Sequence, residues 1–454
     1  MVGIGGAGMS AIAYILLQMG KKVSGSDISY NGVIRRLEGL GAEVFIGHRA
    51  ENVDTPDVVV VSSAIRGDNP ELLEAKRKGI PVLKRIEMLK LMSQGKKLVA
   101  ITGTHGKTTT TSMTALVFKE CGLDPTILIG GELNDIGGNA VLGRGEFVVS
   151  EVDESDGSFV ILDPYVQIIT NVEGDHLEHY GGDIKNLYGA FVEVARKVPD
   201  DGWVVICAEH PSAGVLRGAL GGRSGVVEYG LGDTFTAVAK DIDFRGMGSE
   251  YDFWWKGKRI GRLELKVPGV HNVLNSLAVL SVVMLLGMDV QRAFRALSKF
   301  RGVHRRFEPI GEAMGVEVFD DYAHHPSEIV ATLEAARKVW SDRRLVVVFQ
   351  PHRYTRTKAL YEDFAKALCM ADFVVITDIY PADESPIEGV TSMLIVDSMK
   401  NMGYTNVEYI PWKDILEASA TVRAGDVLFT IGAGDVYKVG KGILSRLQEG
   451  ADGF

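Results

Sequence analysis

A strand that leads into a glycine loop, a lysine and paired threonines constrains this chain more than any other feature. Residues 98–111 read LVAITGTHGKTTTT, and the β-branched run predicts a strand that turns at Gly103 and Gly106 before a helix. Backbone N–H groups of such a loop point at phosphate oxygens, Lys107 brings positive charge to them, and the Thr108 hydroxyl can bind Mg²⁺. The spacing G-x-x-G-K-T is tighter than the usual phosphate loop, so an ordinary strand, turn and helix with a surface lysine is the alternative.

The composition indicates a globular chain of several domains. Its 454 residues are 46% hydrophobic and 24% charged, which is ordinary for a soluble protein. A net charge of −10 argues against nucleic-acid binding. The three cysteines, Cys121, Cys207 and Cys369, are far apart, so neither a disulfide framework nor a zinc site is indicated. The longest apolar stretch, 277–288, is too short to cross a bilayer, so we expect no membrane insertion and a cytoplasmic location.

Runs rich in valine and isoleucine alternate with helical patterns, which is the sequence form of parallel sheets built from βαβ units. The predicted fold class is α/β with three domains. We expect an N-terminal Rossmann-like domain over 1–92, a central P-loop ATPase-like domain over 93–301 and a C-terminal Rossmann-like domain over 302–454. The central sheet is expected to be mostly parallel, with a small antiparallel hairpin section over 226–267. Strands are expected at 22–23, 44–46, 57–61, from 98, and at 147–150, 166–170, 203–207, 316–319, 345–349, 373–377, 407–410 and 427–431.

Polar residues follow the expected strands at their carboxyl ends, where open α/β sheets bind ligands. Glu151 directly follows one strand of the central domain, and His176 lies in the loop after the next. Because these two strands are expected to flank the strand from Leu98, both residues are candidate ligands of a metal beside Thr108. Carboxylate and hydroxyl suit Mg²⁺, whereas imidazole is a less usual ligand for it. A solvated acidic loop and a hydrogen-bonded loop histidine are the alternatives.

A second glycine loop, GIGGAG, begins at Gly3 and is followed one strand later by Asp27. Its spacing G-x-G-x-x-G predicts a pyrophosphate-binding turn. Only Met1 and Val2 precede the loop, so most of a first strand is missing, and we expect the natural start to lie several codons earlier. An NAD-dependent dehydrogenase is the alternative, although one such loop does not establish hydride transfer.

Amide and arginine side chains mark two further places. His271, Asn272 and Asn275 open an otherwise apolar helix, where the amides either read an adenine edge or cap the helix. Arg305 and Arg306 lie where the third domain begins. An arginine there can close onto a nucleotide phosphate, and a solvated run of charges between domains is the alternative.

The third domain concentrates arginines and histidines in two neighbouring loops. Arg353 and Arg356 follow an expected buried strand, and this places two guanidinium groups as carboxylate clamps over the cleft. His324 and His325 occupy the loop after another strand. Surface salt bridging explains one of these arginines but not the concentration of all four side chains.

Taken in order, these motifs resemble the Mur ligase family over nearly the whole chain. The motifs are Gly103-Thr-His-Gly-Lys-Thr-Thr109, Glu151-Val-Asp-Glu-Ser-Asp156, Asn171 to His176, Pro268-Gly-Val-His-Asn-Val-Leu-Asn275, Arg306-Phe307, Asp321-Tyr-Ala-His-His-Pro326 and Gln350-Pro-His-Arg-Tyr-Thr-Arg356. The phosphate loop is general to the family and is shared in variant form with folylpolyglutamate synthetase. The last two motifs point to the member that adds alanine.

The resemblance implies ATP-dependent ligation of L-alanine to the lactyl carboxylate of UDP-N-acetylmuramate through an acyl phosphate, with Mg²⁺, in peptidoglycan precursor synthesis. It implies catalytic roles for Lys107, His176, Arg306 and His324, and metal binding by Thr108, Glu151 and His176. It implies ATP binding by Gly103, Thr104, His105, Gly106, Lys107, Thr108, Thr109, His271, Asn272, Asn275 and Arg306. It implies UDP-sugar binding by Gly3, Gly5, Gly6, Gly8, Asp27 and Ser63. It implies amino-acid binding by Tyr322, His324, His352, Arg353 and Arg356, in a monomer or weak homodimer.

One departure from the family pattern limits what the resemblance carries over. Several relatives have a carbamylated lysine about fifteen residues after the metal histidine, but Phe191 stands at that distance here, so no carbamate is predicted. The nearest rival is a murein-tripeptide ligase, which uses the same sugar nucleotide with a peptide as nucleophile. A nucleotide-gated binding protein without chemistry is a rival of another class, beside the dehydrogenase.

Overall fold

The computed structural model describes residues 1–133, 138–382 and 384–451. The chain divides into two compact units. The first unit comprises 1–242, 250–265 and 272–300, and the second comprises 243–249, 266–271 and the chain from 301 onward. Among the described residues, no helix is long and apolar enough to span a membrane.

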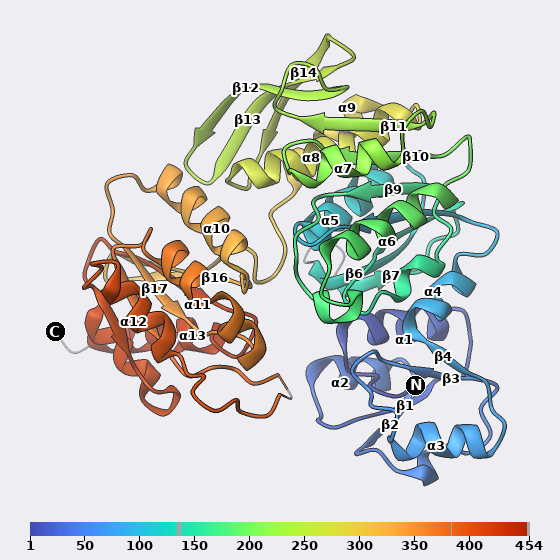
Figure 1. Cartoon of the computed structure of the whole chain (residues 1–454), viewed down its shortest axis with the longest axis horizontal. Helices are drawn as coiled ribbons and strands as arrows, with labels where there is room; N and C mark the ends of the chain where they lie inside the picture. The colour runs from blue at the N-terminus through green and yellow to red at the C-terminus, as the bar shows by residue number, and fades with distance from the viewer. Residues whose placement is uncertain (134–137, 383, 452–454) are drawn as a thin grey trace. The chain divides into compact units, whose positions relative to one another are not determined.

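The N-terminal part of the first unit is a small parallel α/β layer (blue in Figure 1). Its elements are α1 (Ala7–Gln18), β1 (Ser24–Asp27), α2 (Gly32–Gly39), β2 (Glu43–Ile46), β3 (Val59–Val61), α3 (Pro70–Arg77), β4 (Val82–Lys84) and α4 (Arg85–Met92). β1 pairs with β2 and β3 with β4, both in parallel, and Val2 makes parallel bridges to Ser26 and Val61. A single residue, Val2, therefore joins the two strand pairs.

The strand predicted at 22–23 is wrong in position: the strand observed there is β1, Ser24–Asp27, whose sequence Ser-Gly-Ser-Asp has low β-propensity. A Cβ at Gly25 would lie 2.7 Å from the carbonyl oxygen of Met1, so a glycine is needed for the close approach of the backbones. The strand β4 was not predicted.

The rest of the first unit is built on a ten-stranded sheet in the order β14-β13-β12-β11-β10-β9-β5-β8-β6-β7. The strands are β5 (Lys97–Thr102), β6 (Thr126–Leu133), β7 (Gly138–Val141), β8 (Phe147–Glu151), β9 (Val166–Ile169), β10 (Trp203–Cys207), β11 (Val226–Gly230), β12 (Ala237–Arg245), β13 (Gly248–Trp255) and β14 (Lys258–Leu265). Its helices are α5 (Lys107–Glu120), α6 (Ile184–Lys197), α7 (Ser212–Ala219), α8 (Val270–Leu285) and α9 (Val290–Lys299). β8 and β9 flank β5 in parallel, as the sequence predicted.

The antiparallel section is shorter than predicted. β11 is parallel to β10, because α7 lies between them in sequence and forms the crossover that a parallel pair requires. The hairpin section begins at β12, since β12, β13 and β14 are sheet neighbours joined by two-residue turns. A second antiparallel pair, β6 with β7, was not predicted.

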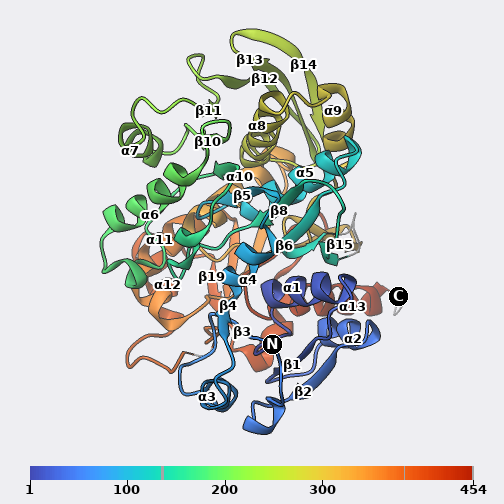
Figure 2. The ribbon, with the colours of Figure 1, turned by 90° about the vertical axis from the view of Figure 1, so that its right-hand side faces the viewer.

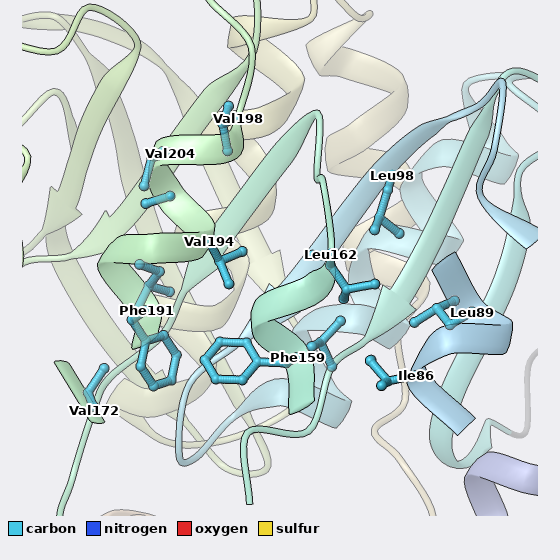
Figure 3. Close-up of a cluster of buried hydrophobic side chains, with 14 of the residues drawn as sticks. Ile86, Leu89, Leu98, Phe159, Leu162, Val172, Phe191, Val194, Val198 and Val204 are labelled. Carbon is cyan, nitrogen blue, oxygen red and sulfur yellow. The ribbon is translucent and has the colours of Figure 1, made fainter. Parts of the chain in front are cut away.

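One face of the central sheet buries a continuous hydrophobic cluster (Figure 3). Phe191 of α6 packs against Phe159 of the 3₁₀ turn Ser158–Ile161, with their ring centroids 5.1 Å apart. Ile86 and Leu89 of α4 join the same cluster, and so does Leu98 of β5. Phe191 is completely buried there. The residue fifteen positions after His176, for which no carbamate was predicted, is thus an aromatic residue of the core.

The second unit is a three-layer sandwich around a six-stranded sheet in the order β15-β16-β20-β17-β18-β19 (orange and red in Figures 1 and 2). Its strands are β15 (Glu308–Ala313), β16 (Val316–Asp321), β17 (Leu345–Phe349), β18 (Phe373–Ile376), β19 (Val407–Tyr409) and β20 (Val427–Ile431). Its helices are α10 (Pro326–Val339), α11 (Tyr354–Leu368), α12 (Met393–Asn401) and α13 (Tyr437–Ala451). Neighbouring strands of this sheet are parallel except β15 with β16, and β15 was not predicted.

Alternating residues of the strands supply the two faces of this sheet. Val347 and Phe349 of β17 pack with α10, α11 and α12, whereas Val346 and Val348 pack with α13. The predicted α/β class, with a mostly parallel central sheet and Rossmann-like ends, is confirmed. The domain boundaries at 92 and 301 stay a prediction.

Candidate active site

The phosphate loop joins β5 to α5, and residues that follow β9 form hydrogen bonds with it. Gly103 and Gly106 both have positive φ, at 122° and 79°. A Cβ at Gly103 would lie 2.2 Å from the Thr170 hydroxyl, so the loop passes too close to its neighbour for any side chain. The amide of Asn171 accepts from the N–H of His105 at 2.9 Å. Strand-end residues therefore fix the loop before any ligand is present.

Lys107 is the first residue of α5, and its ammonium group is folded back over the loop. It donates to the carbonyl oxygens of Gly103 at 2.5 Å and Thr104 at 2.9 Å, and it pairs with the Glu154 carboxylate at 3.0 Å. Only 14% of the Lys107 side chain and 6% of the Glu154 side chain are exposed. Burial alone would lower the pKa of Lys107, but the carboxylates of Glu154, Asp153 and Glu151 outweigh it and raise that pKa.

The hydroxyl of Thr108, in the first turn of α5, lies beside the carboxylate of Glu151, the last residue of β8. Thr108 Oγ1 donates to Glu151 Oε1 at 3.1 Å, and the other carboxylate oxygen accepts from the N–H of Gly130 at 2.8 Å. Two oxygen donors beside a phosphate loop form the kind of donor set that Mg²⁺ prefers, so these residues fit the metal. His176 is the residue before the 3₁₀ turn Leu177–Tyr180, and its ring lies 3.5 Å from Asp175 and 3.6 Å from Glu178.

Asn275 supports the loop from the side of α8. Its amide oxygen accepts from Thr110 Oγ1 at 3.1 Å, and a Cβ at Gly106 would lie 2.7 Å from the same oxygen. Asn275 Nδ2 in turn donates to Asn272 Oδ1 at 3.4 Å, and both asparagines are buried. The bond from Thr110 makes Asn275 part of the loop's support, which goes beyond capping its own helix.

Glu173 also contacts the loop, and His210 lies beside Glu173; sequence reasoning missed both residues. Glu173 lies 3.4 Å from the ring of His105 and 3.7 Å from that of His210, and its N–H donates to Thr104 Oγ1 at 2.9 Å. His210 Nδ1 is 2.7 Å from Ser212 Oγ. Burial lowers the pKa of His210, although the Glu173 carboxylate opposes the shift. The motif Asn171 to His176 marked this loop, but nothing in the sequence indicated its partner His210.

The N-terminal glycine loop leads from Val2 into α1. Gly3 has a φ of 80°, and the N–H of Gly5 donates to the Asp27 carboxylate at 2.8 Å. The N-cap Gly6 has no side-chain cap. A Cβ at Gly8 would lie 2.9 Å from Arg85 Cδ. The structure thus brings together the predicted loop and Asp27, whereas Ser63 is exposed in the turn after β3.

The second unit brings the predicted aromatic and histidine side chains together. The ring of His324 lies 5.3 Å from Tyr322 and 5.8 Å from His352, centroid to centroid. His352 Nδ1 is 3.2 Å from Arg356 Nη1, and Arg356 is 8% exposed. Burial lowers the pKa of His324 to about 4, although Glu328 opposes the shift. His324 is therefore neutral at physiological pH.

Arg353 has an unusual backbone for its place before α11. Its φ is 71°, and its N–H donates to the carbonyl oxygen of Tyr380 at 2.8 Å. Its Nε is buried and has no hydrogen-bond partner among the residues that the structure describes. Tyr380 also stacks on the His352 ring, 5.6 Å away and tilted by 9°. A strained backbone and an unsatisfied guanidinium nitrogen are features of a binding position.

The two arginines at the start of the second unit differ in their surroundings. Arg305 is committed to the fold, because it pairs with Asp320 at 2.9 Å and donates to the carbonyl oxygen of Gly432 at 2.6 Å. Arg306 is more exposed, lies over the Tyr322 ring at 5.3 Å and pairs with Glu328 at 3.4 Å. Burial, with help from Arg306, lowers the pKa of His271 to about 4.

The predicted ATP-binding set divides between the units. The loop residues from Gly103 to Thr109, with Asn272 and Asn275, belong to the first unit, and His271 and Arg306 belong to the second. The predicted amino-acid set belongs entirely to the second unit.

Three family profiles match successive stretches of the chain. They are described as Mur ligase family, catalytic domain (residues 1–97), Mur ligase middle domain (101–283) and Mur ligase, glutamate ligase domain (305–434). The UDP-N-acetylmuramate–L-alanine ligase of a Geobacter species is 47% identical over 449 residues, covering 98% of this chain and 97% of that protein. The protein of the same name from Pelobacter propionicus is 44% identical and covers 99% and 97%.

Solved structures give the same picture. The UDP-N-acetylmuramate–alanine ligase of Thermotoga maritima has 36% identity and a TM-score of 0.84, covering 99% of this chain and 98% of that one. A murein peptide ligase from Psychrobacter arcticus has 25% identity and a TM-score of 0.72, covering 98% of each chain. The fold is therefore similar to that of these ligases over nearly the full length of the chain.

Proposed function

The chain belongs to the Mur ligase family, and from that membership and the geometry of its site we propose that it joins L-alanine to the lactyl carboxylate of UDP-N-acetylmuramate using ATP. The observation that carries the proposal is the phosphate loop with Lys107, Thr108 and Glu151, in a chain nearly half identical to ligases of that name over 98% of its length. The activity is that of an ATP-dependent, amide-forming ligase of peptidoglycan precursor synthesis.

The chemistry explains why a phosphate loop is needed. A carboxylate does not acylate an amine in water, so ATP first converts the lactyl carboxylate to an acyl phosphate, which L-alanine then attacks with loss of phosphate. Positioning and cationic stabilisation do most of that work. Lys107 is the proposed catalytic cation. On ATP binding, its ammonium group exchanges the carbonyl oxygens of Gly103 and Thr104 for phosphate oxygens.

Thr108 and Glu151 are proposed to hold Mg²⁺, and His176 to serve a second ion. The metal, when bound, neutralises charge on the phosphates and favours attack by the carboxylate oxygen. The protein's own contribution is to hold the donors in place. The Gly130 N–H fixes one oxygen of Glu151, and its other oxygen faces Thr108.

Asn272, Asn275 and His271 are proposed to lie at the adenine, and Arg306 to reach the nucleotide. The neutral state of His271, which follows from its lowered pKa, suits a base edge better than a phosphate. The proposed division of labour follows the predicted domains: sugar nucleotide on 1–92, ATP on 93–301 and amino acid on 302–454.

The amino-acid end is proposed to comprise Tyr322, His324, His352, Arg353 and Arg356. A guanidinium pairs with a carboxylate through two parallel hydrogen bonds, so Arg356 is the proposed partner of the alanine carboxylate. His352 Nδ1, at 3.2 Å from Arg356 Nη1, orients that guanidinium. We further propose that the enzyme is cytoplasmic, since its substrates include ATP. We also propose that it is a monomer or a weak homodimer.

Phosphate release tests the proposal directly. The chain is incubated with ATP, Mg²⁺ and UDP-N-acetylmuramate, and L-alanine is compared with other amino acids and with a murein tripeptide. Release that depends on both the sugar nucleotide and L-alanine supports the proposal, and preference for the tripeptide makes the chain a murein peptide ligase. NADH absorbance in parallel tests the dehydrogenase, and ATP binding without phosphate release in any mixture overturns the ligase.

A further inference from the structure

Arg85 is the first residue of α4, the helix that connects the N-terminal layer to β5. Its side chain is 22% exposed. Its one polar contact among the described residues is a long ion pair, in which Nη2 lies 4.0 Å from the Asp153 carboxylate. A largely desolvated guanidinium with five N–H donors and one distant partner has most of its hydrogen-bonding capacity unused. Its neighbours show what it can bind.

On one side, Arg85 lies directly over the N-terminal glycine loop. A Cβ at Gly8 would lie 2.9 Å from Arg85 Cδ and 3.1 Å from Nη1, so Gly8 leaves the room that the guanidinium fills. Gly8 is in the first turn of α1, which has no acidic residue and no side-chain cap. The loop is thus built to accept negative charge, and Arg85 adds a full positive charge to it.

On its other side, Arg85 faces the acidic loop after β8, which surrounds the phosphoryl-transfer site. Asp153 interacts electrostatically with Lys107 as well as with Arg85. Glu154 of the same loop pairs with Lys107, and Glu151 at the end of β8 contacts Thr108. One guanidinium therefore stands between the predicted sugar-nucleotide loop and the phosphate loop.

The arrangement around Arg85 is fixed by contacts within the first unit. Asn139 Nδ2 donates to the carbonyl oxygen of Ala7 at 2.8 Å and to Ser10 Oγ at 3.0 Å, which ties the first turn of α1 to β7. α1 also contacts α4 and β6 (Figure 1). The first turn of α1, which contains Gly8, is therefore held in place beside Arg85.

We propose that Arg85 binds an oxyanion of the sugar-nucleotide substrate, at the point where that substrate passes from the glycine loop to the phosphate loop. The inference rests on the proposed function, because a sugar nucleotide with a carboxylate must span these two loops for the carboxylate to meet ATP. Two groups of that substrate share the chemistry: its diphosphate and its lactyl carboxylate. Either forms the bidentate pair for which a guanidinium is suited.

Calorimetric titration of Arg85→Met with two ligands tests the inference and separates the two sources. UDP-N-acetylmuramate carries both anionic groups, whereas UDP-N-acetylglucosamine lacks the lactyl carboxylate. If Arg85 binds the carboxylate, the variant weakens UDP-N-acetylmuramate by about 10- to 100-fold and leaves UDP-N-acetylglucosamine unchanged. If Arg85 binds the diphosphate, both ligands weaken by the same factor. Unchanged affinity for both ligands overturns the inference.

Two controls keep the result interpretable. Lys90→Met removes a cation from the same helix, where Lys90 is already paired with Asp163 at 2.8 Å, and it should leave both affinities unchanged. Arg85→Lys, which keeps the charge but not the fork, should recover part of the affinity if Arg85→Met lost it. If the wild-type chain itself fails to turn over UDP-N-acetylmuramate, the proposed function fails. A normal wild type with an unaffected Arg85→Met variant overturns the inference alone.

Discussion

The buried pair of Lys107 and Glu154 gives a prediction that separates stability from catalysis. Lys107→Met removes the ammonium group and leaves the Glu154 carboxylate with 6% of its side chain exposed. A buried charge that loses its partner costs about 3–5 kcal/mol. The variant should therefore be clearly less stable than the wild type at pH 8, besides losing activity.

The loss should depend on pH, because Glu154 can take up a proton. Burial raises the pKa of Glu154, and Lys107 is the largest opposing influence, so removing Lys107 raises that pKa further. A carboxyl group whose folded pKa lies above its unfolded value favours the folded state below the unfolded pKa and loses that contribution as pH rises through the folded pKa. The stability gap between variant and wild type should therefore be small near pH 5 and large at pH 8.

The assay is urea denaturation without ligands, followed by circular dichroism at pH 5 and pH 8, with midpoints compared at equal slopes. Adding Glu154→Gln to Lys107→Met should recover about 2 kcal/mol or more at pH 8, since the amide carries no charge, but it should recover no ligase activity. As a control, Lys97→Met breaks an exposed pair with Glu146 and should cost less than about 1 kcal/mol at either pH.

The reasoning is refuted if the stability loss of Lys107→Met is the same at both pH values. It is also refuted if the second substitution recovers nothing. In the first case Glu154 does not titrate in response to its partner, and in the second the pair is not the origin of the loss. UDP-N-acetylmuramate binding should stay nearly intact in Lys107→Met, because the sugar nucleotide is proposed to bind mainly to the N-terminal layer.

Three further predictions concern other parts of the site. Arg356→Lys should raise the alanine KM and lower kcat/KM about 10- to 1,000-fold, with ATP and sugar-nucleotide KM values unmoved; weakened ATP binding instead would show that Arg356 binds a phosphate. Gly106→Ala should cost about 1–3 kcal/mol in thermal unfolding and weaken ATP binding, because its φ is 79° and its Cβ would meet Asn275 Oδ1 at 2.7 Å; wild-type values would contradict this. Burial lowers the pKa of His271 to about 4, so as pH falls below 6.5 the unfolded chain binds a proton at His271 before the folded chain does, and wild-type stability should drop by up to about 3 kcal/mol towards pH 4. His271→Gln should therefore show a smaller change of the urea midpoint with pH than the wild type. Parallel pH profiles of wild type and variant would exclude His271 as a cause.

The phosphate loop and its neighbours could be predicted because strand order follows from local patterns. Glu151 directly follows an apolar run, so once β8 is placed beside β5 its carboxylate must lie near Thr108. The fold class follows from the same alternation of strands and helices. The predicted strand boundaries were less accurate where backbone packing outweighs β-propensity. In β1, Gly25 takes part in a strand because the backbone of Met1 passes so close.

The residues that were missed depend on tertiary contacts that leave no local mark. Glu154 looks like its neighbours in an acidic loop, but in the folded chain it is the buried partner of Lys107, the proposed catalytic lysine. Glu173 meets His210 from a distant part of the chain. Arg85 looks like an ordinary first residue of a helix, and only its close approach to Gly8 in the folded chain shows where its guanidinium lies. Charge, burial and close approach of this kind follow from the folded chain alone.

The acyl phosphate is the central claim, and one isotope experiment tests it most directly. UDP-N-acetylmuramate with both oxygens of its lactyl carboxylate labelled with ¹⁸O is incubated with the chain, ATP, Mg²⁺ and L-alanine, and the released phosphate is examined by mass spectrometry. If the carboxylate attacks the γ-phosphate of ATP and alanine then displaces that phosphate, one ¹⁸O atom must pass into each phosphate released. Amide formation with unlabelled phosphate would contradict the account.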